Sequence, residues 1–466
     1  MKRQIVNWEE DIKPLFPTGT LEFIVETPFF RGRYVNLDNA ATTSAFKFVE
    51  EAVQSVLISY GSIHRGSGQK SKISTDGYEQ ARGIIGEFVG ATSEHYVLFT
   101  KNTTEAINHA AALFAGIPGK VLVSDIEHSS NLLPWLRHGE VVQYKTMDDG
   151  VIDDDDIVKV LKENAGKTGN DQIKLLAITG ASNVTGYKPN IHYLALLAHQ
   201  FGVKILVDAC QLVPHERINM MPEVYPEHID FITFSGHKMY APFGVGVLVG
   251  SKSFFDQSSI YQIGGGNLPY ITRDLQIKRF RTAQAHEPGT PNFLGAIALA
   301  AAVKILTALE RKFGYKVIAQ YEAEIVREAH RKIKEIPTVE LYVREDKLGS
   351  IIPFDIRGIP HHLTAEILSQ EYGIGVRAGS FCTYEIMRTL KNVSAEEDKT
   401  IAEDVDRGIT RNIPGIVRAS FGLVNKREDV DRFVTAVSEI AQHNLTYYAH
   451  KYHQDSKTGR WSLHGE

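Results

Sequence analysis

The feature that most constrains the fold is a series of short apolar runs, none of which alternates with polar residues. Strands that are covered on both faces of a parallel sheet have this pattern. A helical pattern at residues 191–201, followed by Gly202, lies between two of the runs. The order strand, helix, strand predicts right-handed crossovers and a doubly wound α/β sheet. The expected parallel strands are 121–123, 175–178, 205–207, 231–234 and 245–249.

The pattern changes after about residue 294. Two long helical patterns and two strand-like runs follow, at 295–313, 315–336, 339–343 and 350–354, and then a helix at 361–372. This mixture predicts a smaller α+β domain, and 466 residues are enough for two domains. We therefore expect an N-terminal segment at 1–20 that packs with the small domain, a large domain at 21–294 and a small domain at 295–466.

Composition and charge exclude several classes of protein. Hydrophobic residues make up 43% and charged residues 23% of the chain, as in ordinary globular proteins. The net charge of −5 gives no basic surface for nucleic acid or an anionic membrane. With only two cysteines, Cys210 and Cys382, neither a disulfide scaffold nor a cysteine-rich zinc site is expected, and we predict no metal site.

The sequence also indicates a cellular location. The N-terminal residues contain no apolar segment of the kind found in signal peptides. The most apolar run, 294–303, has about half the length that a membrane span needs. We therefore expect a cytoplasmic protein.

Several polar residues directly follow the expected strands, at the sheet edge where doubly wound folds bind ligands. Lys238 suits a Schiff-base nucleophile, although a surface lysine in a turn is the simpler explanation. Ser235 and His237 beside it can donate hydrogen bonds to a phosphate. Asp208 either pairs with a protonated heteroaromatic nitrogen or caps a helix. His128 either stacks on a flat cofactor and moves a proton, or fills a polar corner.

For Thr104, Cys382 and Arg418, too, a functional and a purely structural interpretation are both open. Thr104, in NTTEA, begins a helical pattern and suits either an anion site or a helix cap. The Asn183 amide can reach a phenolic oxygen. Cys382 lies near Arg377 in a glycine-containing loop and is either a low-pKa nucleophile or an inert buried thiol. Arg418 either clamps a carboxylate or forms a structural ion pair.

The joint order of these residues is more specific than any one of them. Five of them share one expected sheet edge and supply an anion site, a stacking ring, an amide, a carboxylate and a Schiff-base lysine: Thr104, His128, Asn183, Asp208 and Lys238. Pyridoxal 5′-phosphate (PLP) needs this combination of groups. The sequence therefore predicts a PLP enzyme.

Ten motifs, spread over nearly the whole chain, carry a resemblance to a known family. They are LDNAATT (37–43), IHRG (63–66), NTTEAIN (102–108), EHSSNLLPW (127–135), SNVTG (182–186), VDACQLVPH (207–215), FSGHKMYAPFGVGVL (234–248), GTPN (289–292), RAGSFC (377–382) and VRASFGLVN (417–425). With them the chain resembles the class V, fold-type I PLP enzymes, and among these the SufS-like group of cysteine desulfurases and selenocysteine lyases. FSGHK and VDACQ are specific for the superfamily, and RAGSFC is more specific for the desulfurases.

The resemblance implies a role for each matching residue. Lys238 would form the Schiff base, Asp208 would pair with the pyridine nitrogen, and His128 would stack on the ring and transfer protons. Cys382 would attack the substrate sulfur and become a persulfide, leaving alanine. The other implied contacts are Thr103, Thr104, Ser235 and His237 with the phosphate, Asn183 and Gln211 with the phenolic oxygen side, Thr290 with the phosphate of a neighbouring subunit, and Arg418, Arg377 and Asn39 with the substrate.

The sequence departs from the family pattern at three places. Ser380 and Phe381 precede the cysteine, where many relatives have a histidine. The segment from Cys382 to Arg418 is longer than is typical, with an extra charged helix expected around 395–407. Cys210 stands at the family's usual glycine.

We expect a PLP-dependent cysteine desulfurase that converts L-cysteine to L-alanine with a persulfide on Cys382. One alternative is another class V PLP enzyme, such as an aminotransferase, epimerase or carbon–sulfur lyase, in which Cys382 is not catalytic. A second is a non-catalytic sulfur carrier or scaffold. The expected partners are a small amino acid, a second copy of the chain that shares the active sites, and a sulfur-acceptor protein.

Overall fold

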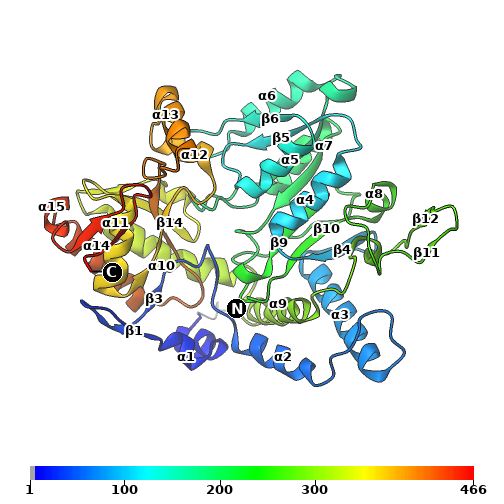
Figure 1. The fold of residues 1–466 in the computed structure, drawn as a ribbon, viewed down its shortest axis with the longest axis horizontal. Coiled ribbons are helices and arrows are strands. Elements are labelled where there is room, and N and C mark those ends of the chain that lie inside the picture. Colours follow the sequence, from blue (N-terminus) through cyan, green and yellow to red (C-terminus); the bar gives the residue numbers. More distant parts are fainter. Residues whose placement is uncertain (1–5, 466) are drawn as a thin grey trace.

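The apolar runs of the first half form the centre of a seven-stranded sheet (Figure 1). The structure is a computed structural model that describes residues 6–465. The strand order is β4-β10-β9-β8-β7-β5-β6. These strands are β4 (His95–Thr100), β5 (Lys120–Ser124), β6 (Val141–Tyr144), β7 (Ile173–Thr179), β8 (Lys204–Asp208), β9 (Phe231–Ser235) and β10 (Gly246–Ser251).

Four of the five expected strands are parallel, and the fifth is not. Strands β5, β7, β8 and β9 pair in parallel, as predicted. Strand β10 pairs antiparallel with both β9 and β4, so the prediction of a parallel strand at 245–249 was wrong. The connection from β9 covers only residues 236–245, and a parallel crossover needs a dozen residues or more.

Both faces of the large sheet are covered, which explains why its strands lack polar alternation. Leu122 of β5 packs into the apolar core on one face, while Val121 and Val123 pack into the core on the other. Helices of the first core are α2 (Lys47–Leu57), α3 (Gln69–Phe88), α6 (Asp154–Asn164), α7 (Ile191–Gln200) and α9 (Phe293–Phe313), and those of the second are α4 (Thr103–Phe114), α5 (Leu133–His138) and α8 (Lys252–Gln257).

Helix α9 belongs with the large sheet. It packs beside α2 and α3, and its apolar residues are part of the first core (Figure 1). Among residues 6–465 it is the one helix long and apolar enough to cross a membrane, but 61% of that apolar window is buried inside the protein. Its hydrophobicity is that of a core helix. The domain boundaries at 20 and 294 stay predictions, and this packing favours a second boundary after α9.

The rest of the chain forms a second unit around a four-stranded antiparallel sheet. Its strand order is β13 (Val339–Leu341), β14 (Ile351–Ile356), β17 (Ile416–Ser420) and β16 (Arg377–Gly379). Helices α10 (Val317–Lys334), α11 (His361–Tyr372) and α14 (Arg427–Ile440) contribute to its core. An early segment also joins this unit, because β3 (Val35–Asn36) pairs in parallel with β15 (Ile374–Gly375).

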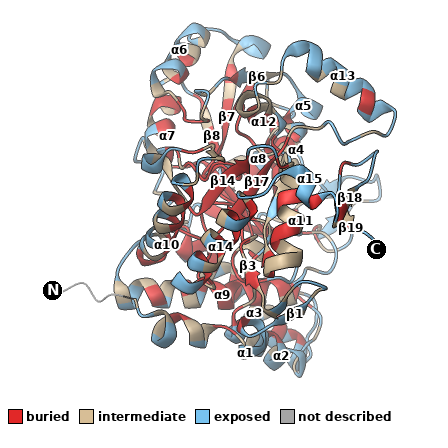
Figure 2. Cartoon of the chain, turned by 90° about the vertical axis from the view of Figure 1, so that its left-hand side faces the viewer, coloured by how far each residue is buried: buried red, intermediate tan, exposed pale blue. Residues whose placement is uncertain are grey.

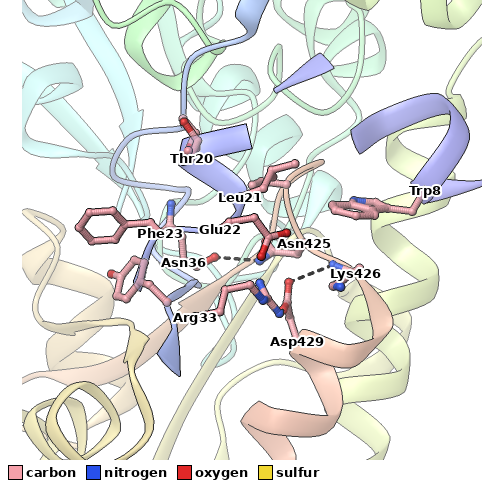
Figure 3. Close-up of a pocket in the computed structure, with 14 residues that line it drawn as sticks. Trp8, Thr20, Leu21, Glu22, Phe23, Arg33, Asn36, Asn425, Lys426 and Asp429 are labelled. Atoms are coloured by element: carbon pink, nitrogen blue, oxygen red, sulfur yellow. Dashed lines mark hydrogen bonds and ion pairs between the residues drawn. The ribbon is translucent and has the colours of Figure 1, made fainter. Parts of the chain in front are cut away.

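The N-terminal segment contacts both units. The Trp8 indole Nε1 donates to the Leu423 carbonyl at 3.0 Å, whereas Ile12 and Phe16 pack in the core of the large sheet. A cavity of about 350 Å³ lies between this segment and the start of α14, where Arg33 forms an ion pair with Asp429 (Figure 3). Residues 1–5 of the predicted segment lie outside the described residues.

The extra charged helix expected around 395–407 is α13 (Ala395–Asp406). Ser394 and Glu397 form a capping box that satisfies backbone N–H groups at its start. The helix projects from the body of the protein, and most of its surface is exposed (Figure 2). Helix α12 (Tyr384–Leu390) connects it to the Cys382 loop.

A buried histidine on α4 makes the fold sensitive to acid. His109 stacks on Tyr261, and burial lowers its pKa to about 3, with a smaller contribution from His286. In the unfolded chain His109 takes up a proton near pH 6.5, whereas in the folded chain it does not until about pH 3. The contribution of the neutral ring to the free energy of unfolding is therefore fully present above pH 6.5 and is lost as the pH falls toward 3.

We expect His109→Leu to weaken this pH dependence. Between pH 7.5 and pH 5 the wild type should lose about 2 kcal/mol more unfolding free energy than the variant. Urea unfolding at both pH values measures the difference, with exposed His138→Leu as the control. Equal losses for the wild type and His109→Leu would contradict the prediction.

Candidate active site

A cavity of about 330 Å³ lies at the carboxyl ends of the large sheet's parallel strands, beside strands β16 and β17 of the second sheet. It brings together the predicted residues Thr103, Thr104, His128, Asn183, Asp208, Gln211, Ser235, His237, Lys238, Arg377, Cys382 and Arg418. The predicted residues Asn39 and Thr290 are not part of its lining. Residues that stand far apart in the sequence thus share one site because the strand ends meet there.

The end of β8 places a buried carboxylate in this cavity. Asp208 Oδ1 accepts a hydrogen bond from the Cys210 N–H at 3.1 Å, and Oδ2 has no partner among the described residues. Burial raises the pKa of Asp208, although the Cys210 N–H and the charge of Lys238 oppose the shift. A buried carboxylate of this kind is stabilised when a cationic N–H donor enters the cavity.

Helix α4 points its first residues at the cavity. Asn102 caps the helix by accepting a hydrogen bond from the Glu105 N–H, so the N-cap residue is Asn102 and neither of the threonines. The Thr103 N–H donates to the Ser235 hydroxyl at 2.8 Å. The Thr104 hydroxyl pairs with Ser130 at 2.8 Å. Hydroxyls and a helix N-terminus gathered in this way suit a phosphate.

His128 is a neutral imidazole at neutral pH. Burial lowers its pKa to about 4, and the charges of Lys238 and Arg418 add to the shift. Its Nδ1 accepts from the Ser130 N–H at 3.1 Å, which places the ring proton on Nε2. Burial and Lys238 likewise lower the pKa of His237 to about 4. The ring of His128 is therefore available to stack on a flat group and to donate its Nε2 proton.

Glu127 anchors the segment that carries His128. It is buried and accepts from the Ser124 hydroxyl, the Asn131 amide and the Thr179 N–H at 2.6, 2.7 and 2.9 Å. These bonds join the ends of β5 and β7. Burial raises the pKa of Glu127 to about 8 despite the three donors.

Cys382 lies on a loop held in an unusual backbone conformation. Phe381 and Cys382 have φ angles of 55° and 56°, in the left-handed region that L-residues seldom adopt. Ser129 donates from its N–H and its hydroxyl to the Cys382 carbonyl at 2.8 and 2.7 Å. Asn183 donates to the Phe381 carbonyl at 2.8 Å. These bonds hold the exposed cysteine at the cavity.

Asn183 is therefore tied to the cysteine loop. Besides its bond to Phe381, its side-chain oxygen accepts from the Thr383 hydroxyl at 2.8 Å. Its backbone carbonyl accepts from Arg418 at 2.9 Å. The predicted contact with a phenolic oxygen stays a prediction, and the described contacts are with the cysteine loop and Arg418.

The two arginines meet on neighbouring strands and share a carboxylate. Arg377 and Arg418 are register partners of β16 and β17, and both pair with Asp38, at 3.0 and 3.2 Å. Arg418 is buried and lies under the Phe381 ring, with its guanidinium carbon 4.5 Å from the ring centroid. Burial lowers the pKa of Arg418 to about 10, and its Nε has no hydrogen-bond partner.

Two predicted contact residues make structural bonds, and a third lies exposed at the surface. Asn39 is buried and donates to the carbonyls of Asn36 and Ser420 and to Asn425. Gln211 lines the cavity and donates to the Ala40 carbonyl at 2.8 Å. Thr290 is exposed in the turn before α9.

Sequence reasoning missed the roles of Asp38, Glu127 and Ser129. Each stands in a quoted motif, Asp38 in LDNAATT and the other two in EHSSN. The only available signal for Asp38 was an acidic residue inside a quoted motif, because its two arginine partners lie more than 300 residues away in the sequence. The Ser129 bond to Cys382 depends on loop packing and has no such signal.

Comparison with known proteins identifies the family. The model of the class V aminotransferases matches residues 35–433. The chain belongs to the class V aminotransferase family. A probable cysteine desulfurase from Halalkalibacterium halodurans is 30% identical over 451 residues, which cover 94% of this chain and 98% of that protein. Another from Staphylococcus aureus strain Mu50 is 29% identical and covers 88% of this chain and 92% of its own.

Solved structures of this class V group have the same fold. An apo cysteine desulfurase from Thermococcus onnurineus NA1 superimposes with a TM-score of 0.76 at 30% identity, covering 88% of this chain and 95% of its own. The S-sulfonic acid form of the cysteine desulfurase CsdA from Escherichia coli gives 0.74 at 27% identity, covering 94% and 99%. The predicted fold-type I architecture and the predicted membership of this group of enzymes are confirmed.

The cavity of this class V enzyme fits PLP, the cofactor on which its family depends. The Oδ2 atom of Asp208 has no partner and suits the ring nitrogen. The start of α4 with Ser235 suits the phosphate, and His128 suits the face of the ring. Lys238 lines the same cavity and makes no hydrogen bond or ion pair within residues 6–465. Its amine is thus available to bind a carbonyl carbon.

Proposed function

We propose that this protein is a PLP-dependent cysteine desulfurase. One observation carries the proposal: Cys382, an exposed thiol on a hydrogen-bonded loop, lines the same cavity as Lys238, Asp208 and His128. An aminotransferase or epimerase has no chemical need for a thiol at this place. The cysteine desulfurases among the relatives and solved structures support the same reading.

Arg418 would bind the carboxylate of the amino acid. Its Nε has no partner, and Asp38 and the Asn183 carbonyl hold the rest of the guanidinium in a fixed orientation. Arg377 on the neighbouring strand adds a second positive charge. The ring of Phe381 lies over the guanidinium, with the guanidinium carbon 4.5 Å from the ring centroid. A planar guanidinium with a free N–H donor is suited to a carboxylate.

The proton and sulfur steps use groups of this chain. Bound PLP supplies the electron sink that makes the α-proton of an amino acid acidic. Lys238 is the amine beside that position that can accept the proton, and His128, which carries its proton on Nε2, can donate one.

The Cys382 thiolate then attacks the substrate γ-sulfur, since only the thiolate is nucleophilic enough. The carbon–sulfur bond breaks as the sulfur–sulfur bond forms. The released electron pair takes a proton at the carbon, so cysteine and the Cys382 thiol become alanine and a Cys382 persulfide. A thiol reductant or acceptor protein removes the outer sulfur and restores the thiol.

We further propose a homodimer in the cytoplasm. Thr290 lies outside the cavity of its own chain and is exposed, which supports a contact with the phosphate site of a second copy. Light scattering of the holoenzyme should give the mass of two chains of 52.0 kDa. A fully active monomer would contradict the shared site.

Product analysis tests the proposed activity. Holoenzyme is incubated with L-cysteine and excess dithiothreitol, and alanine, sulfide and pyruvate are quantified. Equal amounts of alanine and sulfide are expected. Pyruvate with sulfide would indicate a carbon–sulfur lyase, and an α-keto acid formed only with an amino acceptor would indicate an aminotransferase. Either result would overturn the proposal.

A further inference from the structure

A second cluster of chemically active side chains lies at the amino ends of strands β8 and β9, at the opposite end of these strands from Lys238. His199 at the end of α7, His228 and Asp230 before β9 place three ligand atoms within 4.8 Å of one another. The side chain of Asp230 is only 3% exposed, and those of His199 and His228 are 17% and 13% exposed. The cluster is therefore largely shielded from water, and the reaction proposed above does not use it.

Hydrogen bonds determine which ring nitrogens of the two histidines carry protons. His199 Nδ1 lies 2.6 Å from the Pro226 carbonyl, and His228 Nδ1 lies 2.7 Å from the Tyr225 carbonyl. A carbonyl oxygen only accepts hydrogen bonds, so both Nδ1 atoms must be protonated. In the neutral rings both Nε2 atoms then present lone pairs.

These two lone pairs face a carboxylate. His199 Nε2 lies 2.9 Å from Asp230 Oδ2, and His228 Nε2 lies 3.7 Å from Asp230 Oδ1. Acceptors at such distances repel each other unless a proton or a metal cation lies between them. A proton on His199 alone would still leave the His228 Nε2 lone pair facing Asp230 Oδ1 at 3.7 Å, and protonating both rings would put two positive charges on stacked rings whose centroids are 4.2 Å apart. One divalent cation satisfies all three ligand atoms without that repulsion.

We propose that His199, His228 and Asp230 form a structural site for a divalent transition-metal cation of the Zn²⁺ class. Two imidazoles and a carboxylate are ligands that Zn²⁺ prefers, and the atoms around a tetrahedral Zn²⁺ lie about 3.3 Å apart. The spacings of 2.9 and 3.7 Å bracket that value. Histidine ligands usually donate their other N–H to a carbonyl or carboxylate, as both rings do here.

The site would fasten the segment that leads into β9 to helix α7. That segment carries His228 and Asp230, and Asp230 Oδ2 also accepts from the Ile205 N–H of β8 at 2.9 Å. Lys204 pairs with Asp230 Oδ1 at 2.6 Å, but its side chain is 44% exposed and is able to turn away into solvent. Lys204 and a metal ion thus compete for this oxygen.

Metal titration of the full-length holoenzyme tests the site. Because an exposed thiol such as that of Cys382 is itself a Zn²⁺ ligand by type, all variants carry Cys382→Ser. Zn²⁺ is titrated in competition with a chromophoric chelator, and the melting temperature is measured with and without Zn²⁺. We expect one Zn²⁺ per chain and a higher melting temperature with the metal. His199→Asn and His228→Asn should each weaken binding by at least about 100-fold, more than loss of an outer-shell partner does.

The chain offers a matched control on the same helix. His192 Nδ1 also bonds a carbonyl of the following segment, that of Glu227 at 2.9 Å, but His192 lies outside the cluster. His192→Asn should leave Zn²⁺ binding unchanged, and Lys204→Met should tighten it about tenfold by removing the competing charge.

Other results would overturn the site. One is that the protein takes up no Zn²⁺ at chelator-buffered micromolar concentrations, which would leave a hydrogen-bonded ion pair. The other is that the His199→Asn and His228→Asn proteins bind Zn²⁺ as tightly as the parent. If one histidine variant does not fold, the other and Lys204→Met decide the question.

Discussion

Lys238→Ala is expected to abolish the visible absorption of the lysine-bound cofactor and to lower alanine formation by at least about 10³-fold. The amine lines the cavity and makes no hydrogen bond or ion pair in the described part of the chain. Its removal therefore breaks no hydrogen bond or ion pair, and the melting temperature should stay close to that of the wild type. The substitution thus separates loss of chemistry from loss of folding.

The absorption spectrum and the steady-state rate of alanine formation measure both effects. Lys101→Ala is a suitable control, because Lys101 lies just before α4, near the proposed phosphate site, and its side chain is 82% exposed. That variant should keep the spectrum and most of the activity. If Lys238→Ala retained the wild-type spectrum, the assignment of Lys238 as the cofactor lysine would be wrong.

The part of the site formed by strand ends could be predicted from the sequence. Asp208 and Lys238 each follow a short apolar run, and parallel strands bring such positions to one edge. The direction of β10 could have been predicted from the short connection 236–245, which is too short for a crossover. Local pattern alone, apolar and continuous, is the same for parallel and antiparallel buried strands.

The part formed between the two units could not be predicted in this way. Asp38 reaches Arg377 and Arg418 because β3 crosses to the second unit and pairs with β15. A two-residue strand has no periodicity to reveal its partner. The bond from Ser129 to the Cys382 carbonyl likewise joins loops that are far apart in sequence. Such contacts depend on tertiary packing, and only the motifs containing these residues were visible.

The effect of removing the thiol from Cys382 decides between a desulfurase and its class V alternatives. Cys382→Ala should keep the cofactor spectrum, since the bonds that hold the loop use the backbone carbonyls of Phe381 and Cys382. Alanine formation from L-cysteine should fall by at least about 100-fold, because no other exposed thiol lines the cavity to accept the sulfur.

Cys210→Ala provides the matched control. Cys210 lines the same cavity but is buried, and its sulfur accepts a hydrogen bond from the Thr103 hydroxyl at 3.3 Å. Its loss should leave most of the activity, with at most a modest weakening of cofactor binding. Mass spectrometry of the wild type after L-cysteine and without reductant should find one extra sulfur atom on the Cys382 peptide and none on the Cys210 peptide. Equal turnover by Cys382→Ala and the wild type would make Cys382 a bystander, and the substrate would then be sought among amino acids that need no sulfur acceptor.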